Sequence, residues 1–133
     1  MKNIMEIVKI IASNSKCNRK KVGCVATKDG RIIATGYNGT PPGEKNLCEK
    51  DGKTTENVIH AEQNMIAFCA KNGISLKDTT IYISLSPCIK CATLLLQSGV
   101  KSVYYEEEYR ETSGVELLNK YGIICTKFKT IKE

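Results

Sequence analysis

The sequence predicts a single-domain α/β protein, a sandwich in which helices pack around a mixed β-sheet. The chain has 133 residues, which suffices for one core of ordinary size and leaves no room for a second. An antiparallel hairpin pattern comes first, and strands then alternate with helices, which is typical of a mixed sheet. Because 41% of the residues are hydrophobic and 26% are charged, neither disorder nor a fibrous repeat is indicated. We expect one domain spanning residues 1–133.

The N-terminal segment is expected to form an amphipathic helix. Apolar residues recur there at helical spacing and would pack one face inward: Ile4, Ile7, Val8 and Ile11. Glu6 and Lys9 interrupt the apolar run, so the segment lacks the pattern of a secretory signal peptide. No stretch is apolar over the length that a bilayer requires. We therefore expect a cytoplasmic protein without membrane contact.

A hairpin is expected next. Two β-rich runs, residues 22–27 and 31–37, flank Asp29-Gly30, a pair that favours a tight turn. The following segment, residues 38–57, is rich in Gly, Pro, Asn, Asp and Thr and is longer than most connections in compact domains. Long connections of this kind are often functional, so we expect this one to contribute to a site.

The second half of the chain is expected to alternate between helices and strands. Ser86 suits a helix N-cap and Pro87 the first helical position, so a helix is expected to begin there. Glycine-containing pairs at 72–73 and 98–99, and Gly122, mark helix ends. The expected elements are a helix over 60–71, a strand over 80–85, the helix from Ser86 to about 98, a strand over 102–105, a helix over 115–120 and a strand over 123–128.

The net charge of +6 does not by itself indicate a nucleic-acid partner. The lysines are scattered along the chain, and only 6% of the residues are aromatic, whereas nucleic-acid sites usually gather both kinds of side chain on one face. A solvated, basic surface is the simpler interpretation. Anionic small molecules such as phosphates remain compatible with it.

The cysteines are not expected to form a disulfide framework. Their number, seven, is odd, their spacing is irregular, and thiols stay reduced in a cytosol. Most of a group of five are interpreted as small buried hydrophobic residues or bystanders: Cys17, Cys24, Cys48, Cys69 and Cys125. The remaining two stand three residues apart in the segment SPCIKC, residues 86–91.

A zinc site is predicted from this pair and the single histidine. Cys88 and Cys91 would share one helix face, and a helix N-terminus stabilises the thiolates that zinc requires. With His60 they make three ligands, and a catalytic zinc has three protein ligands and one open position. Glu62, two residues after His60, is placed to move protons rather than to bind the metal.

Two other interpretations of these residues belong to different classes of protein. A thioredoxin-like protein also uses Cys-x-x-Cys at a helix start, but it leaves His60 and Glu62 without a role. A non-catalytic zinc-binding module would need no Glu62 and would close the zinc with a fourth ligand.

The residues His60-Ala61-Glu62, followed by PCIKC at 87–91, resemble the signature of the zinc-dependent cytidine and deoxycytidylate deaminase superfamily. The segment GYNGTPPG at 36–43 is similar to a loop of the deoxycytidylate deaminases within it. The resemblance covers residues 17–128 and implies a three-layer sandwich. Its five-stranded mixed sheet would carry the two zinc-bearing helices side by side on one face.

The resemblance implies hydrolytic deamination of deoxycytidylate (dCMP) to dUMP and ammonia. His60, Cys88 and Cys91 would hold one catalytic Zn²⁺ per chain, and water activated by zinc would attack the ring carbon that bears the amino group. Glu62 would carry the proton from the water to the ring nitrogen and then to the departing amine.

The resemblance also implies substrate contacts. The Ala61 N–H would hold the ring carbonyl, the Ser86 C=O would accept from the amino group, and Asn38 would contact the sugar, although Asn-Gly is also a turn signal. Tyr109-Arg110 would hold the phosphate, because a guanidinium grips phosphate bidentately, and Arg19 is a second candidate. The alternative interpretation of residues 106–110 is a solvated surface loop without a binding role.

Regulation and assembly are further implications of the resemblance. Such deaminases are often hexamers that are activated by dCTP and inhibited by dTTP, each with Mg²⁺. In this chain Gly36, Tyr37 and Gly39 would contact the effector, although Tyr37 at a strand end is equally suited to packing. The expected partners are therefore dCMP, the two effectors and further copies of the chain.

The same sequence features bear on related chemistries and on a second metal. A deaminase of nucleosides, or of adenosine in tRNA, would use the same zinc and glutamate, but a tRNA enzyme needs a basic, aromatic surface. Some relatives hold a second, structural zinc, and Cys17 and Cys48 lie in comparable regions. Because His60 is the only histidine and is already used, we expect one zinc per chain.

Overall fold

The computed structural model describes residues 2–40, 48–50, 53–54 and 58–129. A five-stranded sheet forms its centre, in the order β2-β1-β5-β6-β7. The strands β1 and β2 are antiparallel, as are β1 and β5, whereas β5, β6 and β7 are parallel. The bounds are β1 Gly23–Lys28, β2 Arg31–Tyr37, β5 Thr80–Leu85, β6 Ser102–Glu107 and β7 Ile124–Lys127. The predicted mixed α/β sheet is confirmed.

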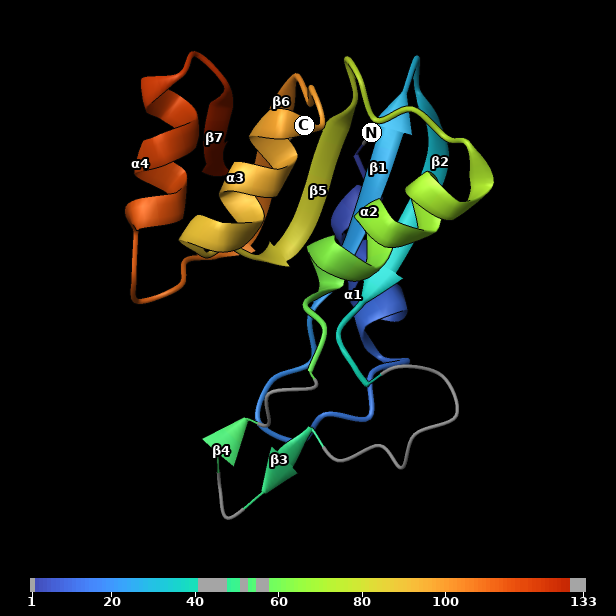
Figure 1. Ribbon diagram of the computed structural model, residues 1–133, viewed down its shortest axis with the longest axis vertical. Helices are drawn as coiled ribbons and strands as arrows, with labels where there is room; N and C mark the ends of the chain where they lie inside the picture. The colour runs from blue at the N-terminus through green and yellow to red at the C-terminus, as the bar shows by residue number, and fades with distance from the viewer. Residues whose placement is uncertain (1, 41–47, 51–52, 55–57, 130–133) are drawn as a thin grey trace.

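Helices cover both faces of the sheet and make three layers (Figure 1). One face carries α2, α3 and α4, and the other carries α1. The bounds are α1 Ile4–Ala12, α2 Ala61–Asn72, α3 Ile89–Gln97 and α4 Ser113–Lys120. The helices α2 and α3 lie side by side, as expected for the pair that bears the candidate ligands. Among the described residues, no helix combines the length and apolar character that crossing a membrane would need.

The N-terminal helix packs through the face that the sequence indicates. Ile4 and Val8 are fully buried against Val25 of β1. Ile7 and Ile11 are half-buried at the border of the same cluster. Three aromatic rings complete this smaller core, those of Tyr82, Tyr104 and Phe128, with ring centroids 5.7 to 6.5 Å apart.

The turns follow the glycine signals. Asp29 and Gly30 both have positive φ values, 51° and 74°, as a type I′ hairpin requires. Gly73 ends α2 in the left-handed conformation, at φ 68°. These positions explain why the hairpin and the end of α2 lie where the sequence predicts them.

The start of α3 differs from the prediction. The helix begins at Ile89, and Cys88, rather than Ser86, is its N-cap, with its Sγ accepting from the Cys91 N–H at 3.5 Å. Ser86 is engaged elsewhere: its N–H donates to the Glu107 carbonyl at 2.9 Å, and its Oγ accepts from the Tyr109 N–H at 2.7 Å. These two bonds keep the chain extended past β5, so the helix starts later.

The remaining boundaries shift by a few residues. The strand β6 continues to Glu107, two residues beyond the predicted end, and α4 begins at Ser113 instead of residue 115. Within the long connection, two short strands that were not predicted, β3 Glu49–Lys50 and β4 Lys53–Thr54, pair with each other. Residues 41–47, 51–52 and 55–57 of that connection lie outside the described residues.

The interpretation of Cys17 and Cys48 as unpaired residues is wrong. They form a disulfide, with their Cα atoms 5.2 Å apart. The fold brings the segment before β1 beside the segment after β2, a contact between positions 31 residues apart that irregular spacing cannot reveal. The other three, Cys24, Cys69 and Cys125, are free and buried, as expected. In the chain-entropy account, closing a loop of this length stabilises the fold by about 3 to 4 kcal/mol.

Gly36 is required for the close approach of α2 to β2. A Cβ at this position would lie 2.5 Å from the Ala61 carbonyl oxygen and 2.9 Å from the Met65 Cβ. We therefore expect Gly36→Ala to lower the free energy of unfolding by about 1 to 3 kcal/mol, measured by denaturant titration. Gly39→Ala is the matched control, because none of the residues that the structure describes lies within 4 Å of a Cβ there. Equal stability of the two variants would contradict this account of the contact.

Candidate active site

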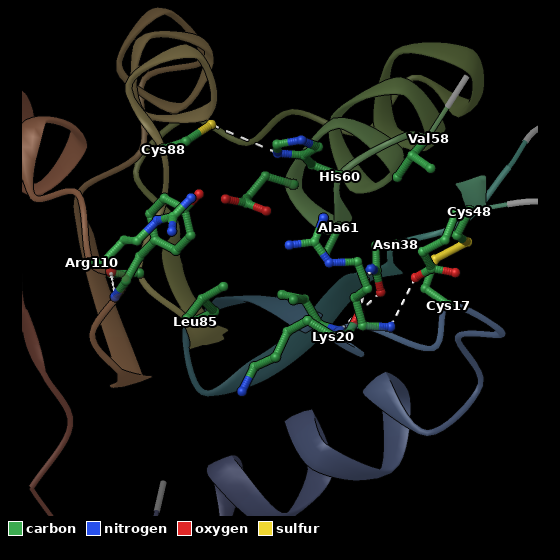
Figure 2. A pocket seen from close by; sticks show the side chains of 16 residues that line it. Cys17, Lys20, Asn38, Cys48, Val58, His60, Ala61, Leu85, Cys88 and Arg110 are labelled. Carbon is green, nitrogen blue, oxygen red and sulfur yellow. Dashed lines mark hydrogen bonds between the residues drawn. A yellow bond between two sulfur atoms is a disulfide. The ribbon is translucent and has the colours of Figure 1, made fainter. Parts of the chain in front are cut away.

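A cavity of about 340 Å³ opens at the N-terminal ends of α2 and α3 (Figure 2). Its wall comes from the segment before β1, the end of β2, the region of the disulfide, the start of α2, and the residues that follow β5 and β6. The lining residues are Cys17, Arg19, Lys20, Val22, Asn38, Cys48, Glu49, Val58, His60, Ala61, Glu62, Leu85, Ser86, Cys88, Tyr109 and Arg110.

The three predicted metal ligands come together at this cavity. His60 is the N-cap of α2, Cys88 is the N-cap of α3, and Cys91 lies in the first turn of α3. The His60 Nδ1 lies 3.7 Å from the Cys88 Sγ and 3.3 Å from the Cys91 Sγ. Figure 2 shows the Cys88 and His60 side chains pointing toward each other from the two helices.

This geometry fits a tetrahedral zinc ion. Zinc bonds of about 2.0 to 2.3 Å to nitrogen and sulfur place neighbouring ligand atoms about 3.5 to 3.8 Å apart. All three ligand atoms lie within 4.8 Å of one another, and in the described part of the chain no fourth His, Cys, Asp or Glu joins the cluster. One nitrogen and two sulfurs are a donor set typical of zinc, and the fourth position would be open to water or substrate.

Hydrogen bonds among the three side chains of the triad shift the pKa of each of them. The side-chain hydrogen bond with Cys91 lowers the pKa of Cys88 to about 3, with a further contribution from His60. The same interaction, followed by burial, raises the pKa of Cys91. The hydrogen bond to Cys88 raises the pKa of His60, although burial opposes this. The pair of sulfurs therefore carries negative charge at neutral pH, which attracts a cation.

Glu62 lies in the first turn of α2 and lines the cavity. Its side chain is buried, with 4% of the residue exposed, and burial raises its pKa to about 7. The backbone hydrogen bond and the nearby His60 oppose this rise. A buried carboxyl group beside a metal site is the arrangement that general acid–base catalysis uses.

The predicted substrate residues all line the same cavity, although they come from five separate segments: Arg19, Asn38, Ala61, Ser86, Tyr109 and Arg110. The Asn38 side chain also has a structural role. Its Nδ2 donates to the Lys20 carbonyl at 2.8 Å, and its Oδ1 accepts from the Val22 N–H at 2.9 Å. Asn38 thereby fixes the segment before β1 at the cavity wall.

The predicted effector residues are not among those that line this cavity. Gly36 packs beneath α2, and Tyr37 is 40% exposed. Gly39 forms an isolated bridge with Ile59, with N–H to carbonyl distances of 3.1 and 2.7 Å in the two directions. This bridge fixes the approach of the chain to His60, so it supports the metal site from the outside.

Several wall residues were missed by sequence reasoning. Lys20 lines the cavity and forms an ion pair with Glu107 at the end of β6. Its position next to Arg19, a predicted phosphate ligand, was the signal that could have identified it. Glu49 and the apolar residues Val22, Val58 and Leu85 carry no pattern that marks them. Their presence follows from which segments the fold brings together.

A candidate metal site and a buried carboxyl group that face one cavity are typical of a metal-dependent hydrolase, because a metal and a carboxyl group together can activate water. The model of the "Cytidine and deoxycytidylate deaminase zinc-binding region" matches residues 1–107. The chain belongs to this family of zinc-dependent deaminases.

Individual relatives agree with the family. The deoxycytidylate deaminase of Enterobacteria phage T4 is 33% identical over 80% of this chain and 77% of its own length. The structure of dCMP deaminase from the cyanophage S-TIM5, in complex with dCMP and dUMP, matches with a TM-score of 0.91 and 39% identity, over 94% of this chain and 93% of that one. A structure from a study of tRNA:A34 deaminases matches at 22% identity with a TM-score of 0.67, over 96% of this chain and 93% of that one, which shows the fold alone.

The triad predicts the metal content of the protein. Elemental analysis is expected to find one zinc per chain, because Cys17 and Cys48 are joined in a disulfide and offer no thiolate. Cys91→Ala should lose most of this zinc, since two ligands bind far more weakly than three. Cys125→Ala, which removes a buried free cysteine of β7, should keep it. Two zinc ions per chain, or full zinc in Cys91→Ala, would contradict the assignment.

Proposed function

We propose that the protein deaminates dCMP to dUMP and ammonia. One observation carries this proposal: a single cavity brings the zinc triad and the buried Glu62 together with the cationic side chains of Arg19 and Arg110. A pyrimidine base at the metal and a phosphate at the arginines would fill such a cavity from end to end. The likeness to a structure that holds dCMP and dUMP supports the same substrate.

Different residues of the chain would hold the metal and transfer protons. His60, Cys88 and Cys91 would hold zinc, which when bound lowers the pKa of a water molecule and so supplies a nucleophile at neutral pH. Glu62 would accept a proton from the attacking water and donate it to the ring nitrogen, and would then transfer the second proton of that water to the departing amine. Its burial at the cavity keeps the carboxyl group close to the reacting atoms and away from bulk water.

The substrate would be held by backbone groups at its base and by side chains at its phosphate. The Ala61 N–H is assigned to the ring carbonyl, the Ser86 C=O to the amino group, and Asn38 to the sugar. The two hydrogen bonds that Ser86 makes with Glu107 and Tyr109 support this assignment, because they fix the orientation of its peptide at the cavity. They also tie the base end of the site to the segment that bears Arg110.

Regulation and assembly form the outer part of the proposal. We assign dCTP, as activator, and dTTP, as inhibitor, to a second site with Mg²⁺ near Gly36, Tyr37 and Gly39. A hexamer and a cytoplasmic location complete it. The exposure of Tyr37 is compatible with a ligand contact outside the cavity. Ammonia release from dCMP with and without each nucleotide tests the regulation.

Replacement of the proposed proton shuttle tests the chemistry. Glu62→Gln should lower kcat for dCMP by about a hundredfold to ten-thousandfold, because the amide cannot take up a proton. Zinc content and thermal stability should stay near those of the parent protein. Glu6→Gln is a matched control, since Glu6 lies in the first turn of α1, on the opposite face of the sheet. Full deamination activity in Glu62→Gln would reject the proton-shuttle role of Glu62, whereas absence of deamination in the parent protein as well would favour a zinc-binding module.

Replacement of the proposed phosphate ligand tests the substrate. Arg110→Ala should raise the KM for dCMP by about tenfold to a hundredfold, the cost of one charged hydrogen-bonding partner, while kcat changes little. Arg31→Ala, at the start of β2 and away from the cavity wall, should leave the KM unchanged. Deoxycytidine should be a poor substrate of the parent protein and of both variants. Equal turnover of deoxycytidine and dCMP would instead indicate a nucleoside deaminase.

A further inference from the structure

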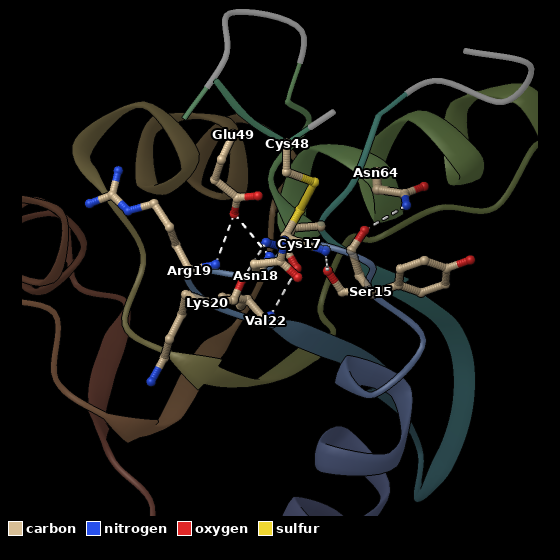
Figure 3. Close-up of a disulfide and its surroundings, with 11 residues drawn as sticks. Ser15, Cys17, Asn18, Arg19, Lys20, Val22, Cys48, Glu49 and Asn64 are labelled. Carbon is tan, nitrogen blue, oxygen red and sulfur yellow. Dashed lines mark hydrogen bonds between the residues drawn. A yellow bond between two sulfur atoms is a disulfide. The ribbon is translucent and has the colours of Figure 1, made fainter. Parts of the chain in front are cut away.

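The disulfide forms part of the cavity wall. Cys17 and Cys48 both line the cavity, and each residue is only 2% exposed. The bond joins the segment that leads into β1 to the segment that leads into β3 (Figure 3). Neither the zinc triad nor the proton shuttle uses this bond, so its place at the substrate site calls for a separate explanation.

Glu49, the neighbour of Cys48, joins the same two segments. Its Oε1 accepts from the Asn18 N–H at 3.0 Å and from the Arg19 N–H at 2.8 Å, as Figure 3 shows. Hydrogen bonds to a carboxylate are stronger than those between neutral groups. The disulfide and this pair of bonds therefore act at adjacent positions, and together they fix the backbone from which the Arg19 side chain extends.

The fixed segment continues along the substrate cavity. The Lys20 carbonyl accepts from Asn38, and the Lys20 side chain forms an ion pair with Glu107 at the end of β6. A displacement of Cys17 would thus be transmitted to Arg19 and Lys20 on the phosphate side of the cavity. It would reach His60 and Glu62 much less, because these residues are held by α2.

We propose that the Cys17–Cys48 disulfide is a redox-sensitive control on substrate affinity. This inference rests on the proposed function and names a regulation of the same site. With the bond closed, the wall that carries Arg19 is held in place for the phosphate. With the bond reduced, Cys48 and Glu49 separate more easily from residues 17–19, and the nucleotide binds more weakly.

The redox step needs a dithiol as reductant. One dithiol thiolate attacks a sulfur of the pair, the S–S bond breaks, and a mixed disulfide forms. The second dithiol thiolate then displaces the protein sulfur, so the reagent becomes a disulfide and two electrons pass to the protein. The two protons of the dithiol end on Cys17 and Cys48. In a cytoplasmic protein, a disulfide is more often redox-sensing or transient than purely structural.

The test compares the KM for dCMP in the oxidised and the reduced holoenzyme. Unfolded in the presence of a chelator, purified protein should show five free thiols, and protein first incubated with dithiothreitol should show all seven cysteines of the chain as thiols. Because a misplacement of about 1 Å at a binding group can cost up to a hundredfold, we expect the KM to rise by about threefold to tenfold. The kcat should change less, and the zinc content, measured in parallel, should remain one per chain.

Two variants separate the disulfide from other effects of the dithiol. The double variant Cys17→Ser, Cys48→Ser should have the raised KM from the start and should not respond to dithiothreitol. Cys125→Ala, which keeps the disulfide, should respond like the parent protein. A response in the double variant would instead trace the effect to the catalytic zinc and would overturn the inference.

The remaining outcomes distinguish this inference from the proposed function. Turnover of dCMP with the same KM in both redox states, or seven free thiols in the purified protein, would overturn the redox control alone. Absence of ammonia release in every state would contradict the proposed function itself.

Discussion

The convergence of two helix N-termini is the constraint on which the rest of the structure depends. His60 and Cys88 are N-caps of α2 and α3, so each helix delivers its first residues, and the positive end of its dipole, to one point. Close packing on either side maintains this arrangement. Gly36 lets β2 approach α2, and Gly114 of α4 lies so near Pro87 that a Cβ there would be 2.2 Å from its carbonyl oxygen. Both contacts position the helix starts that bear His60 and Cys88.

The site has two ends that are built differently. The metal end stands on helix termini and on the buried first turn of α2, where side chains have little freedom. The cationic end is made by irregular segments, which are held by a disulfide, an ion pair and side-chain hydrogen bonds to the backbone. Reacting atoms must be fixed within a fraction of an ångström, and the attraction between an anion and a cationic side chain falls off more gradually with distance. This division agrees with a site whose affinity can be adjusted without loss of its chemistry.

Short-range sequence patterns were enough to predict the candidate metal ligands and most of the fold. The spacing from His60 to Glu62 and from Cys88 to Cys91 is readable because both pairs lie within one helical turn. The hairpin was readable because Asp29-Gly30 suits positive φ. The start of α3 could not be predicted from local sequence, because Ser86 forms hydrogen bonds with Glu107 and Tyr109, which lie more than 20 residues away. The disulfide and the hydrogen bonds of Glu49 could not be predicted for the same reason. Both join segments that lie about 30 residues apart in the sequence.

The parallel register of β5 and β6 has a consequence for how such a scaffold can change. Leu85 pairs with Glu107, so both strands end at the same edge of the sheet, one directly before Ser86 and the other shortly before Arg110. The candidate metal ligands Cys88 and Cys91 follow the end of β5, and the Arg110 guanidinium follows the end of β6. Under the proposed function, the number of residues between β6 and Arg110 sets the distance from the candidate metal site to the phosphate. Insertions or deletions between Tyr109 and Arg110 would change the length of ligand that this arrangement accepts while leaving the bond from Tyr109 to Ser86 in place.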